Sequence, residues 1–98
     1  MSKLVFKIYI AGTGTRNKAC IASFQKACAT ALPAGVYQIN VIDIVQQPSE
    51  AEANKILATP TITREKPAPP RRTIGDFMES SKAAQALHFL TEDVTNDR

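Results

Sequence analysis

The sequence predicts an α/β protein with one central mixed sheet and the element order β-α-β-α-β-β-α. Residues 3–10 and 36–45 are runs of apolar, β-branched and aromatic types, and between them apolar residues recur at the spacing of a helix. A strand, a helix and a strand in this order predict a right-handed parallel crossover. A chain of 98 residues can build one hydrophobic core, so we expect a single domain over residues 1–98.

The first strand, residues 3–10, is apolar on nearly both faces, which predicts a central position in the sheet. The segment that follows is rich in Gly and Thr, so the chain turns there, and Thr13, Thr15 or Asn17 is expected to cap the next helix. That helix turns one apolar stripe toward the sheet, formed by Ile21, Phe24, Cys28 and Leu32. We expect residues 36–45 to form the second strand, with both of its faces largely covered.

A second, short helix is predicted to open at Pro48-Ser49. Ser49 and Glu52 have the spacing of a capping box, in which each side chain bonds a backbone N–H that the helix leaves without a partner. Because proline cannot donate to a sheet, Pro60 fits only at the very start of a strand. Residues 61–63 are therefore expected to form the third strand.

The last third of the chain is predicted to hold a turn, a strand and a helix. Residues 64–72 contain three prolines and five charged residues, which predicts a stiff turn on the surface. A last short strand is expected over residues 73–77, and the apolar spacing predicts a helix over residues 83–90. From about residue 91 onward we expect a polar tail.

Composition and charge exclude several classes of function. The net charge is +3, but the basic residues stand singly apart from Arg71-Arg72, and only six side chains are aromatic, so we expect no nucleic-acid binding. No run approaches the roughly 18 apolar residues that a membrane span requires, and the N-terminus does not have the pattern of a secretion signal. We therefore expect a cytoplasmic protein that binds no membrane.

The two cysteines, Cys20 and Cys28, lie eight residues apart within the first predicted helix. At about 1.5 Å of rise per residue their backbones stand about 12 Å apart. That exceeds the separation of roughly 7 Å that a disulfide can span, so the two cannot pair within the helix. Small buried hydrophobic residues are the favoured interpretation, and a thiol or redox role for Cys20 is the alternative.

Three further patterns give only weak indications of chemistry. Gly12-Thr-Gly14 at a strand-to-helix turn could meet an anion, but it lacks the Lys and Ser/Thr of a phosphate loop. His88 is the only histidine and has no Cys or His at metal-ligand spacing. Asp43 is a carboxylate in an apolar strand, where a hydrogen bond at the strand end is favoured over a role as a base. We expect no metal and no cofactor.

Lys55, Arg71 and Arg72 form a different kind of candidate. Guanidinium groups suit bidentate pairing with carboxylates, so these three cations could together bind an acidic surface of a partner. Composition alone is equally consistent with solvated surface charge.

The predicted element order, with X-Pro at the start of the third strand, resembles the thioredoxin architecture. A redox Cys-x-x-Cys sits between the first strand and the first helix of that architecture, but residues 12–17 of this chain contain no thiol. More specifically, the strings LVFKIYIAG, GVYQINVIDI, KILATPTI and PPRRTIGDF resemble the KaiB family of circadian clock proteins in order and spacing, over residues 4–90.

The resemblance implies a protein-binding regulator with no catalytic activity of its own. Members bind the ATPase ring of KaiC and through it influence KaiA or a histidine kinase, so a KaiC-like ATPase is the expected partner, in circadian or in stress and timing regulation. The expected partner-binding residues are Lys55, Arg71, Arg72, Gly12 and Thr13. The expected structural residues are Thr59, Pro60, Gly75 and Asp76, with a cis bond between Thr59 and Pro60. A KaiB-like sensor domain that binds a kinase is a further alternative.

The family is also known for two folds, a thioredoxin-like monomer and a different α/β arrangement that forms tetramers. The resemblance therefore allows any state from monomer to tetramer. The C-terminal stretch KAAQALHFL consists largely of strong helix formers, which favours the thioredoxin-like form in this chain. The chain departs from the usual family pattern at residues 13–17, at Ala19 and at residues 86–88, so a KaiC-like ATPase outside a full clock fits as well.

Overall fold

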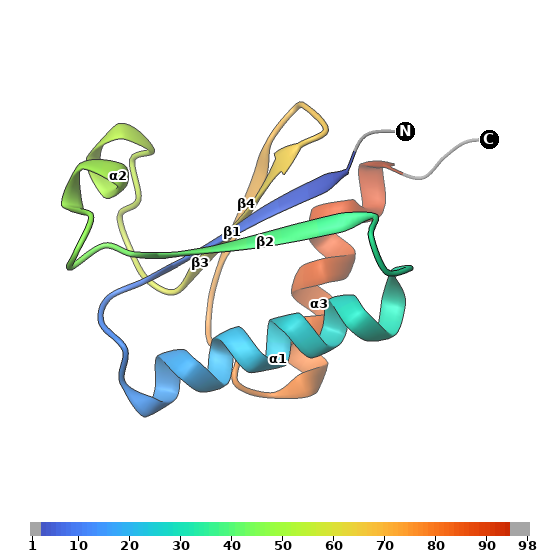
Figure 1. Ribbon diagram of the computed structural model, residues 1–98, viewed down its shortest axis with the longest axis horizontal. Helices are drawn as coiled ribbons and strands as arrows, with labels where there is room; N and C mark the ends of the chain where they lie inside the picture. The colour runs from blue at the N-terminus through green and yellow to red at the C-terminus, as the bar shows by residue number, and fades with distance from the viewer. Residues whose placement is uncertain (1–2, 95–98) are drawn as a thin grey trace.

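A computed structural model describes residues 3–94 and has the predicted order of elements around a four-stranded sheet (Figure 1). The elements are β1 (Leu4–Ile10), α1 (Thr15–Ala31), β2 (Tyr37–Asp43), α2 (Pro48–Ala53), β3 (Thr61–Lys66), β4 (Arg71–Ile74), α3 (Ser80–Thr91) and a 3₁₀ turn (Glu92–Val94). The strands lie in the order β2-β1-β3-β4, with β1 parallel to β2 and antiparallel to β3. The prediction of an α/β fold with a mixed sheet and a central first strand is confirmed.

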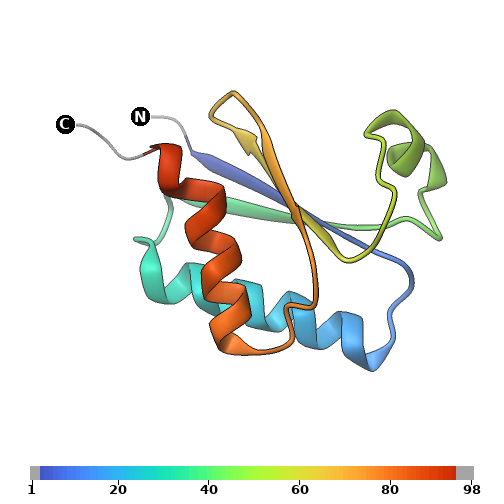
Figure 2. The same cartoon turned by 180° about the vertical axis from the view of Figure 1, so that it is seen from behind.

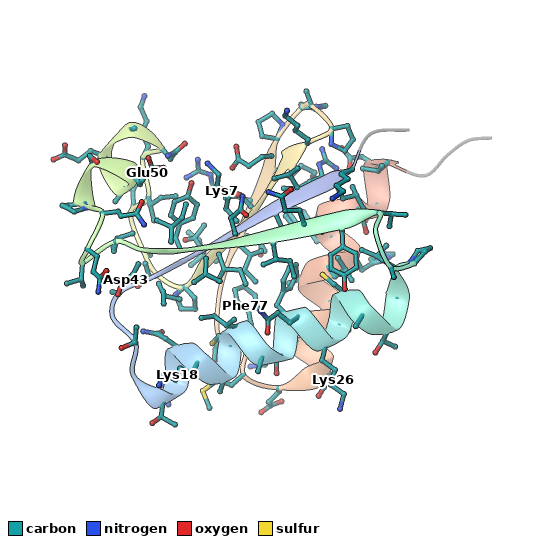
Figure 3. The ribbon with its side chains drawn as sticks, in the orientation of Figure 1. Lys7, Lys18, Lys26, Asp43, Glu50 and Phe77 are labelled. Atoms are coloured by element: carbon teal, nitrogen blue, oxygen red, sulfur yellow. The ribbon has the colours of Figure 1, made fainter. Side chains whose placement is uncertain are left out.

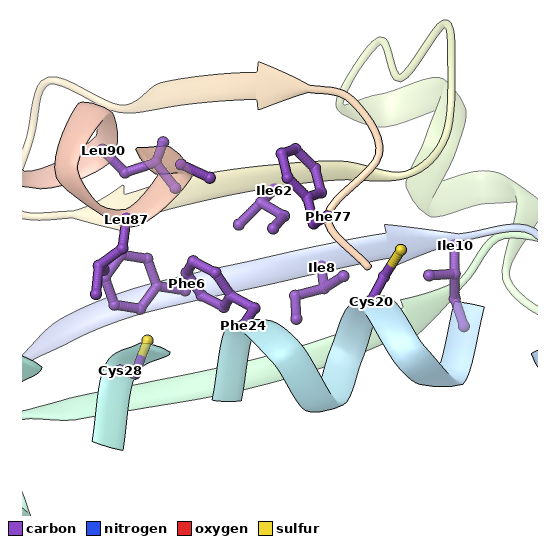
Figure 4. Close-up of a cluster of buried hydrophobic side chains, with 11 residues drawn as sticks. Phe6, Ile8, Ile10, Cys20, Phe24, Cys28, Ile62, Phe77, Leu87 and Leu90 are labelled. Carbon is purple, nitrogen blue, oxygen red and sulfur yellow. The ribbon is translucent and has the colours of Figure 1, made fainter. Parts of the chain in front are cut away.

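The helices cover the two faces of the sheet unequally. α1 and α3 lie together under one face, whereas α2 is set apart at one end of the sheet (Figures 1 and 2). The main core lies between the sheet and the α1–α3 pair, where Phe6 of β1 meets Phe24 of α1 edge to face, with ring centroids 5.3 Å apart (Figure 4). A smaller cluster of Tyr9, Ile42 and Ile56 lies beneath α2. No helix in the described part of the chain is long and apolar enough to cross a membrane.

Neither predicted helix cap forms. α1 begins at Thr15 with Gly14 as its N-cap, and Asn17, already inside the helix, instead donates to the carbonyl oxygens of Ala11 and Gly12. α2 begins at Pro48, whose fixed φ and missing N–H suit the first helical position. Ser49 therefore lies inside the helix, where its side chain cannot act as a cap, and the capping box was a wrong prediction.

The second strand is less covered than predicted. β2 forms the edge of the sheet and pairs only with β1. Ile42 is its one buried residue, while Gln38 and Val41 are exposed. The expectation that both faces of this strand are covered is wrong because α2 reaches only the end of the sheet that contains Ile42.

The predicted surface turn over residues 64–72 is mostly strand. β3 runs on to Lys66 and β4 begins at Arg71, so the turn is confined to residues 67–70, and the strand predicted over 73–77 starts and ends earlier. The predicted turn is short because Arg64 belongs to β3, where it is fully buried on the core side. Its guanidinium donates to the carbonyl oxygens of Leu90 and Pro69 and pairs with Asp93, so a charged residue occupies a core position.

The ion pair between Arg64 and Asp93 ties the 3₁₀ turn after α3 to β3. Thr91 still belongs to α3 and residues 92–94 form the 3₁₀ turn, so the predicted polar tail does not begin at residue 91. The remainder of that predicted tail, residues 95–98, lies outside the described residues. The peptide bond between Thr59 and Pro60 is cis, as predicted, and so are the bonds preceding Pro67 and Pro69.

Candidate docking surface

Most of the predicted site residues gather at one end of the sheet. The register pairs Tyr9 near the end of β1 with Thr61 at the start of β3, and Thr61 with Ile74 at the end of β4. The loops that carry the predicted residues therefore meet there, and they hold Gly12, Thr13, Lys55, Thr59, Pro60, Gly75 and Asp76. Figure 3 shows the same end through Asp43, which terminates β2, and Glu50 of α2.

The chain leaves α2 through a tight turn around Lys55, and residues 54–57 are here named the Lys55 turn. The Ile56 N–H donates to the Ala51 carbonyl at 2.9 Å, and the Lys55 N–H donates to the Glu52 carbonyl at 3.3 Å. This nested pair of bonds is the Schellman arrangement that ends many helices, and Ala51 packs against the apolar cluster that contains Ile56. Lys55 has φ +53°, in the left-handed region where this arrangement usually has glycine.

The Lys55 turn sends its side chains in opposite directions. Ile56 is buried beneath α2, whereas Leu57 is 92% exposed. Lys55 is exposed and makes no ion pair with any residue from 3 to 94. A cation and a large apolar side chain are thus presented to solvent two residues apart, at the end of the sheet where Val45 and Ile74 are also exposed.

Arg72 holds the Lys55 turn from β4. Its Nη2 donates to the Asn54 carbonyl at 2.8 Å and its Nη1 donates to the Lys55 carbonyl at 3.1 Å. These carbonyls follow the last turn of α2, where the helix dipole places partial negative charge. The structure therefore brings the predicted cations Lys55 and Arg72 together, although the Arg72 guanidinium is bonded to backbone.

Arg71 lies elsewhere, because adjacent residues in a strand point to opposite faces of the sheet. Its guanidinium stacks over the Phe89 ring at 4.1 Å from the centroid and lies 3.4 Å from the Glu92 carboxylate and 3.5 Å from that of Asp93. Arg71 thus joins β4 to the end of α3. The three predicted cations do not form one continuous surface.

The loop that carries Gly12 and Thr13 is shaped by hydrogen bonds to its own neighbours. The Gly12 N–H donates to Asp43 Oδ1 at 2.9 Å, and the Val45 N–H donates to the same oxygen at 3.0 Å. Gly12 has φ +88°, which glycine adopts without strain, and Thr13 is exposed. Asp43 is therefore a hydrogen-bond acceptor at a strand end, as favoured from the sequence.

A shallow cleft lies between the start of α1 and the loops around Pro60 and Gly75. Asp76 accepts the Met78 N–H at 3.1 Å and lies 3.4 Å from the Arg16 guanidinium, so its carboxylate shapes the rim of the cleft. Cys20 lines the cleft, but only 3% of its surface is exposed and it packs in the main core.

The second thiol, Cys28, is also free and buried, and burial raises its pKa to about 12. Both cysteines therefore act as small core residues, in agreement with the favoured interpretation of the sequence. Among residues 3–94, no group of three or more His, Cys, Asp or Glu side chains could hold a metal ion.

Sequence reasoning missed two residues of this region. Leu57 follows Ile56 in an apolar string, and nothing in the string shows that one side chain is buried and the next exposed. Asn54 supplies a carbonyl to Arg72, and a backbone atom carries no signature in the sequence. Asparagine after a run of helix formers was the one available sign of a helix end.

The chain is similar in sequence to circadian clock proteins. The family model described as KaiB domain matches residues 7–91. The circadian clock protein KaiB3 of Synechocystis sp. is 34% identical over 92 residues, which cover 94% of this chain and 89% of the relative. The circadian clock oscillator protein KaiB of Picosynechococcus sp. is 37% identical over 89 residues, which cover 91% and 85%.

Solved structures support the fold. The N-terminal domain of SasA from Synechococcus elongatus superposes with a TM-score of 0.72 at 18% identity, covering all of this chain and 91% of that one. Mitochondrial thioredoxin 3 from Saccharomyces cerevisiae superposes with a TM-score of 0.68 at 16% identity, covering 95% and 80%. The thioredoxin-like architecture predicted from the element order is confirmed.

Proposed function

This chain belongs to the KaiB family, and we propose that it is a binding regulator that docks on a KaiC-type ATPase. Its relatives are circadian clock proteins. Regulation by this chain, in a circadian rhythm or in a stress or timing response, is exerted through the ATPase and reaches a KaiA-like protein or a histidine kinase from there. We propose no catalytic activity for the chain itself.

The observation that most directly supports a docking site at the Lys55 turn is the left-handed backbone conformation of Lys55. A residue with a Cβ atom in this conformation costs about 1–2 kcal/mol, whereas glycine in a Schellman turn avoids that cost. Strain of this kind concentrates at functional sites, where a particular side chain is needed in a particular place. We propose that Lys55 is present because its ammonium group meets a carboxylate of the partner.

Leu57 supports the same surface. Leu57 is 92% exposed, and covering its apolar side chain with a partner would lower the free energy of the complex. Interfaces commonly combine an apolar centre with charges at the rim, and the Lys55 turn presents one of each. Gly12 and Thr13 lie at the same end of the sheet and are proposed to extend the contact, while Arg71 is proposed to contribute only through α3.

The test is size-exclusion chromatography with light scattering, on the protein alone and mixed with the KaiC-type ATPase of the same organism in the presence of ATP. We expect a single-domain monomer that moves into the peak of the ATPase ring. Lys55→Glu and Leu57→Asp should each abolish that shift without unfolding the chain, since both side chains are exposed. Lys26→Glu is the matched control, because Lys26 is exposed on α1 and lies on the opposite side of the molecule from Glu50 of α2 (Figure 3).

Two outcomes would contradict the proposal. An unmodified chain that never enters the ring peak under any nucleotide condition would remove the ATPase as the partner. A Lys55→Glu variant that binds like the unmodified chain would remove the Lys55 turn as the docking surface. The burial of Cys20 in the core argues against the thiol alternative.

A further inference from the structure

Arg72 is an exposed cation whose guanidinium is hydrogen-bonded to backbone carbonyls of the Lys55 turn. Two nitrogens of one guanidinium donate to two consecutive carbonyls, those of Asn54 and Lys55, and neither carbonyl accepts another hydrogen bond from residues 3–94. The planar fork of arginine is suited to such paired bonds, whereas lysine has a single nitrogen and no fork. The contact therefore fixes the direction of the backbone on both sides of the Lys55 peptide.

Few side chains support the Lys55 turn apart from Arg72: Asn54 donates its side-chain amide to the Glu50 carbonyl at 2.9 Å. α2 has only six residues, buries none of them completely and lacks a side-chain N-cap. A helix this short is not stable without tertiary contacts. Ile56 anchors the turn to the sheet from below, and Arg72 is the side chain that bonds its carbonyls from β4.

We infer that Arg72 is a positioning residue for docking: it holds Lys55 and Leu57 in their binding geometry and does not itself pair with the partner. This inference rests on the proposed function. It replaces the simpler prediction that Lys55, Arg71 and Arg72 together form one charged patch. The partner surface needed is then an apolar socket with a carboxylate placed for Lys55 alone.

The first experiment measures amide hydrogen exchange in the free protein, so that it does not depend on any partner. The reporters are the amides of Asn54, Lys55 and Ile56, which donate to the carbonyls of Glu50, Glu52 and Ala51 in α2. Arg72→Ala should speed their exchange about tenfold, because two hydrogen bonds from a charged donor are lost. Arg72→Lys keeps the charge and can keep a hydrogen bond, so its exchange rates should lie between those of the unmodified chain and those of Arg72→Ala.

Arg71→Ala is the matched control for the exchange experiment. It removes the same side chain from the adjacent position of β4, but its contacts are with α3 and the 3₁₀ turn. Exchange at the three reporter amides should therefore stay at the rate of the unmodified chain. Equal rates at these amides in Arg72→Ala and in the unmodified chain would overturn the inference.

The second experiment measures affinity for the ATPase at several salt concentrations. Lys55→Ala should weaken binding and also reduce its dependence on salt, because an ion pair with the partner is lost. Arg72→Ala should weaken binding about tenfold and lower the salt dependence less than Lys55→Ala does, because only a long-range attraction is lost. A salt dependence lowered as much as in Lys55→Ala would instead indicate a direct ion pair with the partner and overturn the inference.

Failure of the proposed function is distinguishable from failure of this inference. If the unmodified chain does not bind the ATPase, the proposed partner is wrong and docking through Arg72 falls with it. If the chain binds and Lys55→Ala lowers affinity, the proposed function stands, and the exchange rates together with the salt dependence of Arg72→Ala decide the role of Arg72.

Discussion

Replacing Lys55 with glycine should stabilise the fold and weaken docking at the same time. Glycine removes the cost of about 1–2 kcal/mol for a left-handed residue with a Cβ atom. The unfolded chain gains freedom at a glycine, which offsets about 0.5–1 kcal/mol of that benefit. The net expectation is a stabilisation of about 0.5–1 kcal/mol, or about 2–8 °C in Tm for a domain of this size.

Two measurements on the same variants separate stability from docking. In thermal and urea unfolding, Lys55→Gly should have a higher Tm and a larger free energy of unfolding than the unmodified chain. Lys55→Ala should have values close to those of the unmodified chain, since alanine keeps the Cβ atom. Both variants lack the ammonium group, so both should bind the ATPase about tenfold more weakly, equivalent to about 1.4 kcal/mol. Lys26→Gly is not a usable control because Lys26 lies inside α1, so Lys26→Gln serves instead and should bind normally.

Each half of this reasoning can fail separately. A Lys55→Gly variant that unfolds more easily than the unmodified chain would show that the left-handed backbone is not strained. A more stable variant that binds with unchanged affinity would confirm the strain but refute the interpretation that it preserves a docking lysine.

Three further predictions concern the core and the ends of the chain. Phe24→Ala removes a fully buried ring that packs on Phe6 and should cost about 3–5 kcal/mol in urea unfolding; a loss below about 1.5 kcal/mol would contradict the core. The hydrogen bond from Arg64 lowers the pKa of Asp93 in the folded chain. The ion pair therefore stabilises the fold fully above the pKa of an unfolded Asp, about 3.9, and this stabilisation is lost as pH falls through the lower pKa of the folded chain. Urea midpoints should therefore fall less steeply below pH 4 in Asp93→Asn than in the unmodified chain, and parallel curves would refute this. With a pKa of about 12, Cys28 should resist iodoacetamide at pH 8 until urea unfolds the chain, so rapid labelling of the native protein would be the contrary result.

The sequence predicted the parts of the fold that depend on apolar patterning. β1, α1 and α3 each present apolar residues at the period of their own secondary structure, and those residues form the main core. The parallel β1–α1–β2 unit followed from the order of elements alone. The start of β3 followed from Pro60, because a proline limits where a strand can begin.

Features that depend on contacts between distant residues were out of reach. Arg64 stands among prolines and charges, so its segment reads as a surface turn, yet a carboxylate 29 positions later makes its burial possible. The separation of Arg71 from Arg72 also required the register of β4, since two adjacent arginines read as one basic patch until each is assigned a face of the sheet. In the candidate site, the sequence thus identified the residue types but not which of them are accessible.

The geometry also separates the two cysteines of this thioredoxin-like fold from the proposed docking residues. At the place where the thioredoxin architecture carries its redox thiols, Gly12 and Asn17 bond the backbone and carboxylate groups around them, and Cys20 faces the core. The exposed cation and apolar side chain lie instead on the Lys55 turn, which α2 and Arg72 hold at the same end of the sheet. A variant that introduces a thiol at Thr13 should therefore gain an exposed nucleophile without disturbing the Lys55 turn, because the two loops make separate hydrogen bonds.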